Sequence, residues 1–299
     1  MAGDLGFVLG HGLSAFFPAR LLMGLGAGGL WLGVAFGVLE RFPGDEYRRM
    51  TGVLAAYSIG GVVGPALGAI GGIRGPFLAH LGLVVLAAVV VARLGAPAER
   101  PAFGSDRSAL RTAGFRLASA MIVLVALALG TLEGPLPIHF ATHLSQAEIG
   151  ALYVGGSIVL GAGSVIGGLF APRTMLALGA AVIVVGIALA GAATAVPLWI
   201  VAVALAGIGF GIGESGALGV LLETVGTDRI VLAMVVWSQL WAIGYLAGPA
   251  LAGGIADALG FSYIGLLPLA VSLLVVAAFA RDAGGHSALA PSSTSRSRL

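Results

Sequence analysis

The chain has 299 residues, of which 59% are hydrophobic and only 9% are charged, and its mean hydropathy is +1.06. A soluble globular domain normally carries about 25% charged residues, so this composition excludes one and indicates an integral membrane protein. The formal net charge is +2, every basic residue is arginine, and cysteine is absent. The lack of cysteine excludes disulfides, thiol catalysis and thiolate metal sites.

The first apolar segment, residues 5–17, is too short to cross about 30 Å of hydrocarbon at about 1.5 Å per residue. It has no basic n-region, which argues against a signal peptide, and we expect the trailing end of a helix. The apolar runs that follow are continuous, whereas barrel strands would alternate in short segments. They predict nine membrane-spanning helices, near residues 20–41, 50–72, 76–96, 116–138, 147–171, 174–194, 197–222, 228–256 and 262–280.

The distribution of arginine predicts the orientation of these helices. Loops that carry most of the arginines are expected to face the cytoplasm. When the loop after residues 20–41 is placed in the cytoplasm, only Arg20 and Arg74 remain on the opposite side of the membrane. This orientation predicts a multi-pass protein of the cell (plasma) membrane with a cytoplasmic C-terminus. Residues 97–115 are then a cytoplasmic linker, and residues 284–299, rich in serine, a disordered cytoplasmic tail.

One phrase occurs twice inside the apolar runs. Residues 60–67 read Gly-Gly-Val-Val-Gly-Pro-Ala-Leu, and residues 244–251 read Gly-Tyr-Leu-Ala-Gly-Pro-Ala-Leu. Each phrase is preceded by a glycine run and an acid, namely Gly24–Gly28 with Glu40 and Gly207–Gly211 with Glu223. The two copies are offset by 183 residues for the runs and acids and by 184 for the phrases. This register predicts two pseudo-symmetric halves, an arrangement known among secondary transporters.

Two of these segments resemble motifs of a known family. Residues 20–28, Arg-Leu-Leu-Met-Gly-Leu-Gly-Ala-Gly, resemble the fourth-helix motif of the drug:proton antiporter branch of the major facilitator superfamily, with Met23 where glutamine is usual. Residues 60–68 resemble its fifth-helix antiporter motif, with Ala69 in place of the closing glycine. Glycines permit close helix contact and proline bends a helix. The resemblance implies a seam that moves during transport, formed by Gly60, Gly64, Pro65, Gly68, Gly244, Gly248 and Pro249.

Two further segments resemble vesicular monoamine transporters and their bacterial relatives. Residues 131–137 read Thr-Leu-Glu-Gly-Pro-Leu-Pro in the seventh-helix position, and residues 211–215 read Gly-Ile-Gly-Glu-Ser. The acids of that family in these two helices contact cationic substrate or protons. The resemblance therefore implies such roles for Glu133 and Glu214.

The resemblance also implies a domain organisation. Against the family pattern, the first two helices and most of the third are absent. Residues 1–96 are expected to form a truncated N-terminal half-bundle, equivalent to the end of helix 3 and helices 4–6. Residues 116–283 are expected to form a C-terminal half-bundle of six helices. The implied fold is an all-α integral membrane protein of the major facilitator type.

Three charged residues are candidates to bind substrate or protons. Glu214 lies well inside a span, where a carboxylate must face a cavity, pair with another group or hold a proton. The alternative is a neutral acid hydrogen-bonded between helices. Glu133 lies beside a Gly-Pro break near the outer end of its helix and is either a substrate contact or an interfacial carboxylate in water. Arg20 is either a snorkelling arginine or, given the glycines after it, a coupling residue.

Glu40 and Glu223 are candidates for a cytoplasmic gate. Each lies at the cytoplasmic end of a helix, where the helix dipole disfavours a negative charge. Each is therefore expected to have a basic neighbour, and Arg173 and Arg229 are the candidates for Glu223. An ion-pair latch is one interpretation, and solvated surface acids are the other.

Aromatic residues near the second antiporter phrase are further candidates. Trp237, Trp241 and Tyr245 share one helix face and are candidates to stack on a cationic or aromatic substrate, with Gln239 as a further candidate. Aromatic side chains that face lipid or pack between helices are the alternative. Trp199, beside a proline at a helix start, is expected to anchor at the membrane interface.

The sequence thus predicts a secondary active transporter for proton-coupled efflux of small amphipathic or cationic compounds, a multidrug antiporter working by alternating access. The expected partners are a small-molecule substrate, protons and the lipid bilayer, with no nucleic acid, and the expected state is a monomer. No nucleophile with a base, metal-ligand cluster or phosphate loop is evident, so neither an enzyme nor a cofactor is expected. The alternatives are an incomplete, non-transporting membrane protein and a symporter or uniporter of neutral solutes.

Overall fold

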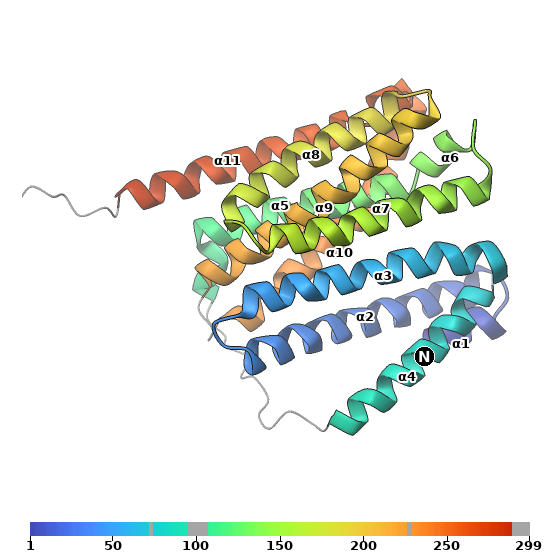
Figure 1. Ribbon diagram of the computed structural model, residues 1–299, viewed down its shortest axis with the longest axis horizontal. Helices are drawn as coiled ribbons and strands as arrows, with labels where there is room; N and C mark the ends of the chain where they lie inside the picture. The colour runs from blue at the N-terminus through green and yellow to red at the C-terminus, as the bar shows by residue number, and fades with distance from the viewer. Residues whose placement is uncertain (72–73, 95–106, 226–228, 289–299) are drawn as a thin grey trace, which may run out of the picture.

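The computed structural model describes residues 1–71, 74–94, 107–225 and 229–288. All regular structure in these ranges is helical, and the long helices run side by side (Figure 1). The α-helices are α1 (Ala2–Leu9), α2 (Leu13–Arg41), α3 (Glu46–Gly71), α4 (Gly75–Leu94), α5 (Ala113–Glu133), α6 (Leu136–Phe140), α7 (Gln146–Gly167), α8 (Pro172–Ala192), α9 (Val196–Thr224), α10 (Ile230–Leu259) and α11 (Leu266–Ala288). The 3₁₀ helices are η1 (Arg107–Arg111) and η2 (Phe261–Tyr263).

Each of the nine predicted spans overlaps a long helix, although the span predicted over residues 116–138 is divided between α5 and the short helix α6. In the described ranges, seven segments are long and apolar enough to cross a membrane. They are Ser14–Arg41, Ala113–Phe140, Gln146–Gly167, Pro172–Ala192, Val196–Thr224, Ile230–Leu259 and Phe261–Ala280. Helices α3 and α4 are not among these seven, so the total of nine spans stays a prediction.

Helix boundaries differ from the sequence-based expectation at both ends of the chain. Residues 5–17 were expected to form the end of one helix, but they belong to two helices, because the helical structure is interrupted between α1 and α2. Gly12 there has a φ of 74°, a left-handed conformation that glycine adopts without steric cost. At the other end α11 continues to Ala288, beyond the start of the expected tail at residue 284, and residues 289–299 lie outside the described part. Residues 97–106 of the expected linker also lie outside the described part.

Helix α9 lies between α7 and α8 and uses glycine on both faces (Figure 1). A Cβ at Gly207 would lie 2.5 Å from the carbonyl oxygen of Gly156 in α7. A Cβ at Gly209 would lie 2.8 Å from the amide nitrogen of Ile183 in α8. Since there is no room for side chains at these positions, the three helix backbones approach one another closely.

The matching glycine run in α2 has different surroundings. Gly24, Gly26 and Gly28 have nothing within 4 Å of the position that a Cβ would take. The two copies of the run are therefore similar in sequence but not in packing within the described residues. The pseudo-symmetry of two halves stays a prediction.

Helix α3 packs along α7, at the line where α1–α4 meet the remaining helices (Figure 1). A Cβ at Gly61 of α3 would lie 2.6 Å from the hydroxyl oxygen of Ser157 in α7. Two glycines are matched with hydroxyl residues of α3, Gly161 of α7 with Ser58 and Gly168, directly after α7, with Thr51. We call these three matched contacts the α3–α7 seam. Small side chains on both helices thus hold α3 at a defined rotation.

Trp199 is a core residue rather than an interfacial anchor, so that expectation was wrong. Its side chain is 0% exposed. The indole nitrogen donates a hydrogen bond to the Ala193 carbonyl at 2.8 Å, and Phe140 packs against the ring. An indole with its polar atom satisfied in this way is stable away from water.

The packing of α9 predicts that Gly211→Leu destabilises the protein. A Cβ at Gly211 would overlap the Leu160 carbonyl oxygen of α7, whereas the equivalent residue of the other run, Gly28, has open space. Overpacking of this kind costs about 1–3 kcal/mol. We expect Gly211→Leu to lower the Tm of the detergent-solubilised protein and Gly28→Leu to leave it unchanged. Equal effects of the two substitutions would contradict the packing described for α9.

Candidate functional site

Glu214 lies in the middle of α9, between two close helix contacts. Gly213 before it packs against Gly179 of α8. Ser215 after it donates a hydrogen bond from its hydroxyl to the Ser164 carbonyl of α7 at 3.1 Å. These contacts set the rotation of α9 and therefore the direction of the carboxylate. Glu214 itself is partly exposed and forms no hydrogen bond or ion pair with the residues that the structure describes.

Glu133 is the last residue of α5 and is exposed. The predicted helix over residues 116–138 is interrupted here, since α5 ends before Pro135 and the short helix α6 follows. The Tyr245 hydroxyl donates a hydrogen bond to the Glu133 carboxylate at 2.5 Å. Trp241 stacks on Tyr245 with ring centroids 5.1 Å apart and an interplanar angle of 9°. In this part of the site, the Tyr245 phenol thus holds the Glu133 carboxylate, and the Trp241 ring stacks on that phenol.

The second antiporter phrase places Tyr245 by packing α10 on α5. A Cβ at Gly130 of α5 would lie 2.5 Å from the Tyr245 carbonyl oxygen, and one at Gly134 would lie 2.7 Å from Pro249. Gly244 of α10 packs in the same way, since its Cβ would lie 3.0 Å from the Val123 carbonyl oxygen of α5. Gly248 also packs against α5. The glycines of both helices therefore face each other around the proline of α10.

Two glycines of the first antiporter phrase have a more open environment than their counterparts in the second. Gly60 and Gly64 have nothing within 4 Å of a Cβ position. Pro65 and Gly68 lie within α3, but their side-chain surroundings are outside the described part of the chain. The two phrases therefore do not share one packing arrangement where they can be compared.

Arg20 and two tyrosines complete the charged and polar groups around Glu133. The Arg20 guanidinium lies within electrostatic range of Glu133 without forming an ion pair with it. Tyr153 of α7 also lies in range of Glu133 and donates a hydrogen bond to the Leu132 carbonyl. Tyr57 of α3 lies in range of Arg20, Glu133 and Glu214. We call the set of Arg20, Tyr57, Glu133, Glu214 and Tyr245 the polar cluster.

The polar cluster contains most of the substrate-site residues that the sequence suggested. Arg20, Glu133 and Glu214 each interact electrostatically with Tyr57, and Trp241 stacks on Tyr245, the hydrogen-bond partner of Glu133. Gln239 is exposed and makes no hydrogen bond with the described residues. Tyr57 and Tyr153 were not predicted from the sequence. A signal was available for Tyr57, because it is a polar aromatic residue one turn before Gly60 of the first antiporter phrase.

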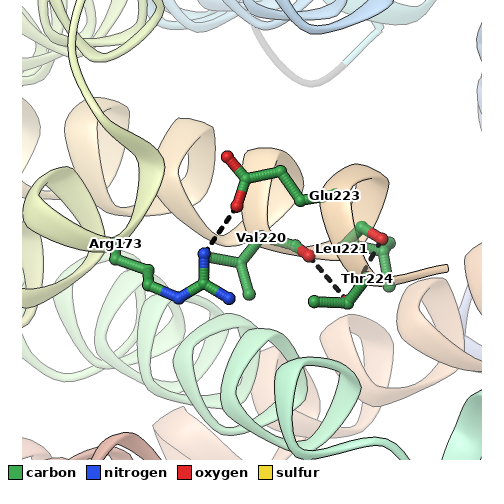
Figure 2. A network of polar contacts seen from close by, with 5 residues as sticks. All are labelled: Arg173, Val220, Leu221, Glu223 and Thr224. Carbon is green, nitrogen blue, oxygen red and sulfur yellow. Dashed lines mark hydrogen bonds and ion pairs between the residues drawn. The ribbon is translucent and has the colours of Figure 1, made fainter. Parts of the chain in front are cut away.

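A second polar group lies at the end of the bundle where α7 and α9 end and α8 begins (Figure 2). An Arg173 guanidinium nitrogen lies 2.7 Å from a Glu223 carboxylate oxygen, with the two side chains 32% and 44% exposed. The predicted partner for Glu223 is therefore Arg173, whereas Arg229 donates a hydrogen bond to the Ser108 hydroxyl at 3.0 Å. Glu40 is exposed and forms no ion pair with the described residues.

Tyr47 joins α3 to this end of the bundle. Its hydroxyl donates a hydrogen bond to the Gly167 carbonyl, the last residue of α7, at 2.7 Å. A Cβ at Gly219 of α9 would lie 2.8 Å from the Tyr47 ring. The Tyr47 ring therefore occupies the space that a side chain at position 219 of α9 would need. Tyr47 thus connects α3 to both α7 and α9.

The histidines of the α6 region have structural contacts. His139 approaches the Ala193 carbonyl at 3.2 Å and stacks on Phe261 at 4.7 Å between ring centroids. His143 packs edge-on against Trp199. Within the described residues there is no group of three or more His, Asp or Glu side chains that could hold a metal ion.

The fold and the polar cluster together define a class of protein. Long apolar helices that carry carboxylates inside otherwise uncharged spans are typical of membrane proteins that move ions or solutes. A family model described as Major Facilitator Superfamily matches residues 117–297. Since the match covers more than half of the chain, the protein belongs to the major facilitator superfamily, whose members are membrane transporters of small molecules. The comparison with curated proteins gave no match.

The exposure of the Arg173–Glu223 pair predicts a small contribution to stability. Exposed ion pairs contribute about 0–1 kcal/mol, because water screens the charges and ordering two side chains costs entropy. We expect a double-mutant cycle with Arg173→Gln and Glu223→Gln, followed by thermal unfolding in detergent, to give a coupling energy below about 1 kcal/mol. A substantially larger coupling would show that the pair is part of the structural core.

Proposed function

We propose that the protein is a secondary active transporter that exports small amphipathic or cationic compounds in exchange for protons. The observation that carries the proposal is the polar cluster, in which two carboxylates, from α5 and α9, both interact electrostatically with Tyr57 of α3. An unpaired carboxylate in such a place is costly unless it binds a cation or a proton. Membership of a transporter superfamily supports the same function.

Glu214 is the residue to which we assign the exchange of proton and substrate. It has no hydrogen-bond or ion-pair partner among the described residues, so a bound cation or a proton is its available partner. When Glu214 takes up a proton, the counter-charge for a cationic substrate is lost and the substrate is released. The two events exclude each other at one carboxylate, which is the requirement for exchange.

Glu133 has a different role in the proposal, because it already has a partner. The Tyr245 hydroxyl and the nearby Arg20 both compensate its negative charge. Glu133 therefore contributes negative charge at one end of the site, and Tyr245 fixes the position of the Glu133 carboxylate. Arg20 sets the charge balance of the cluster, since it disfavours a second cation close by.

Alternating access requires relative movement of two half-bundles around the polar cluster. In the proposal the halves are residues 1–96 and 116–283, joined by the linker at residues 97–115. The α3–α7 seam connects them along its length, and at one end the Tyr47 hydroxyl bonds from α3 to the Gly167 carbonyl of α7, whereas the Arg173–Glu223 pair lies within the second half. The arginine distribution assigns this end to the cytoplasm. Glu40 and Arg229 are the remaining candidates for the gate.

The proposed setting follows from the same orientation. We place the protein in the plasma membrane, with a cytoplasmic C-terminus, as a monomer. Neutral-solute transport and a non-transporting protein are the alternatives that the following two experiments test.

Transport is expected to depend on the Glu214 carboxylate. Proteoliposomes with wild-type protein should accumulate or release ethidium when a pH gradient is applied, and Glu214→Gln should reduce the rate at least tenfold because an amide cannot exchange a proton. Asp257→Asn is the matched control, since Asp257 is an exposed acid of α10 outside the polar cluster. Unchanged transport by Glu214→Gln would remove Glu214 from the mechanism. The absence of transport by the wild-type chain would favour a non-transporting protein.

Proton exchange is expected to be visible on substrate binding. A cation that binds at Glu214 displaces its proton, so adding tetraphenylphosphonium to the detergent-solubilised protein in a weak buffer should release protons. Glu214→Gln should show no release, and a pH-indicator dye would follow both reactions. Proton uptake with substrate would indicate a symporter, and no change in proton concentration would indicate a uniporter.

A further inference from the structure

Helix α1 and the turn after it are attached to the α4 region by three side-chain contacts that the proposed mechanism does not use. The contacts follow the two segments in opposite directions, one contact to each helical turn. They join Asp4 to His80, Phe7 to Phe77, and His11 to Arg74. Because residues three or four positions apart lie on one face of a helix, one face of α1 is turned toward one face of α4. We call these three contacts the α1–α4 contact line.

Asp4 is the buried member of the contact line, since its side chain is only 1% exposed. The helix behind it packs tightly on α2, where a Cβ at Gly3 would lie 2.6 Å from the Ala19 carbonyl oxygen. One Asp4 carboxylate oxygen lies 2.6 Å from the His80 Nδ1 atom, and the other lies 2.9 Å from the Met1 amino nitrogen. A carboxylate held away from water is costly unless a cation or a proton compensates its charge. His80 and the Met1 amino group are the two groups that do so.

His80 is able to exchange a proton with its surroundings, because its side chain is 52% exposed. An ionised carboxylate only accepts hydrogen bonds, so the Nδ1 atom that faces Asp4 carries a hydrogen. The Nε2 atom of the ring is therefore the one that takes up or loses a proton. Imidazole is the side chain whose charge ordinarily changes between pH 5 and 8. With the proton His80 forms an ion pair with Asp4, and without it only a hydrogen bond remains.

The second histidine of the contact line responds to pH in the opposite direction, but more weakly. An Arg74 guanidinium nitrogen lies 3.1 Å from the His11 Nε2 atom. Arginine can only donate, so a proton on this His11 nitrogen would break the hydrogen bond. Both side chains are exposed, and water screens charges at such a position. On the α2 side, Arg20 forms no ion pair with Asp4 in the described ranges. The buried carboxylate therefore dominates the pH response.

We propose that Asp4 and His80 form a proton-binding site, separate from the polar cluster, that holds α1 against α4 while His80 is protonated. Since the bound proton favours the attached form of α1, linkage requires attachment to be strongest in acid and to weaken as the pH rises. The site lies at the end of the bundle where α2 begins, opposite the Arg173–Glu223 pair (Figure 1). The inference does not rest on the proposed function, because it concerns only the attachment of α1.

The test is the distance between α1 and α4 as a function of pH, measured by double electron–electron resonance on the full chain in detergent. The chain has no cysteine, so Leu9→Cys and Leu83→Cys, at positions 71% and 54% exposed, carry the only two spin labels. Between about pH 5.5 and about pH 8.5 we expect the single narrow distance to be lost from about half of the molecules, in favour of a broad distribution.

Three substitutions in the labelled chain assign the response to the pair. Asp4→Asn should abolish the pH dependence, because an amide gives His80 no charge to pair with. His80→Gln still donates a hydrogen bond but binds no proton, so it should give the broad distribution at both pH values. His11→Gln is the matched control on the same contact line and should respond as the wild type does. Thermal unfolding of each variant checks folding, and His80→Gln decides alone if Asp4→Asn does not fold.

The other possible results overturn the inference. A distance that is the same at both pH values in the wild type would show that no proton controls the attachment of α1. A wild-type response in both Asp4→Asn and His80→Gln would assign the proton to another group, such as the Met1 amino group. Loss of the response in His11→Gln alone would assign it to the exposed contact with Arg74.

Discussion

Close contact between helix backbones at glycine is the constraint on which the rest of the structure depends. Inside a membrane the hydrophobic effect does not hold helices together, because lipid is as apolar as the side chains that face it. Packing must then come from surfaces that fit. Helix α9 meets α7 and α8 through glycines on two faces, and α10 meets α5 through glycines of both helices. Contacts without side chains leave little freedom in rotation, so each helix presents a defined set of residues to its neighbours.

That constraint explains why the polar cluster is found where it is. Gly213 and Ser215 hold α9 on either side of Glu214, and Gly130 and Gly134 hold α10 where Tyr245 reaches Glu133. The arrangement of the polar residues is a consequence of glycines that lie between one residue and one helical turn away from them. A substitution that moved one of these helices would therefore alter the site without touching any charged group.

The sequence predicted the helices and the family well and the site only in part. Long apolar runs predict helices because hydrocarbon offers the backbone no other hydrogen-bond partners, and the match to residues 117–297 confirmed the superfamily. Arg173 was one of two partners expected for Glu223. Tyr57 and Tyr153 were missed because helices that are apolar all round give no periodic signal for their rotation. Trp199 was misplaced since a buried and an interfacial indole look alike in a sequence.

The α3–α7 seam has a mechanical consequence. Thr51 and Ser58 are seven residues apart, as are their partners Gly168 and Gly161, so the two contacts are separated by about two helical turns. Shifting one helix lengthwise by a single turn would push a hydroxyl against a residue with a larger side chain. The seam therefore fixes the lengthwise register of α3 on α7, so relative movement of the helices on either side of it has to keep this register.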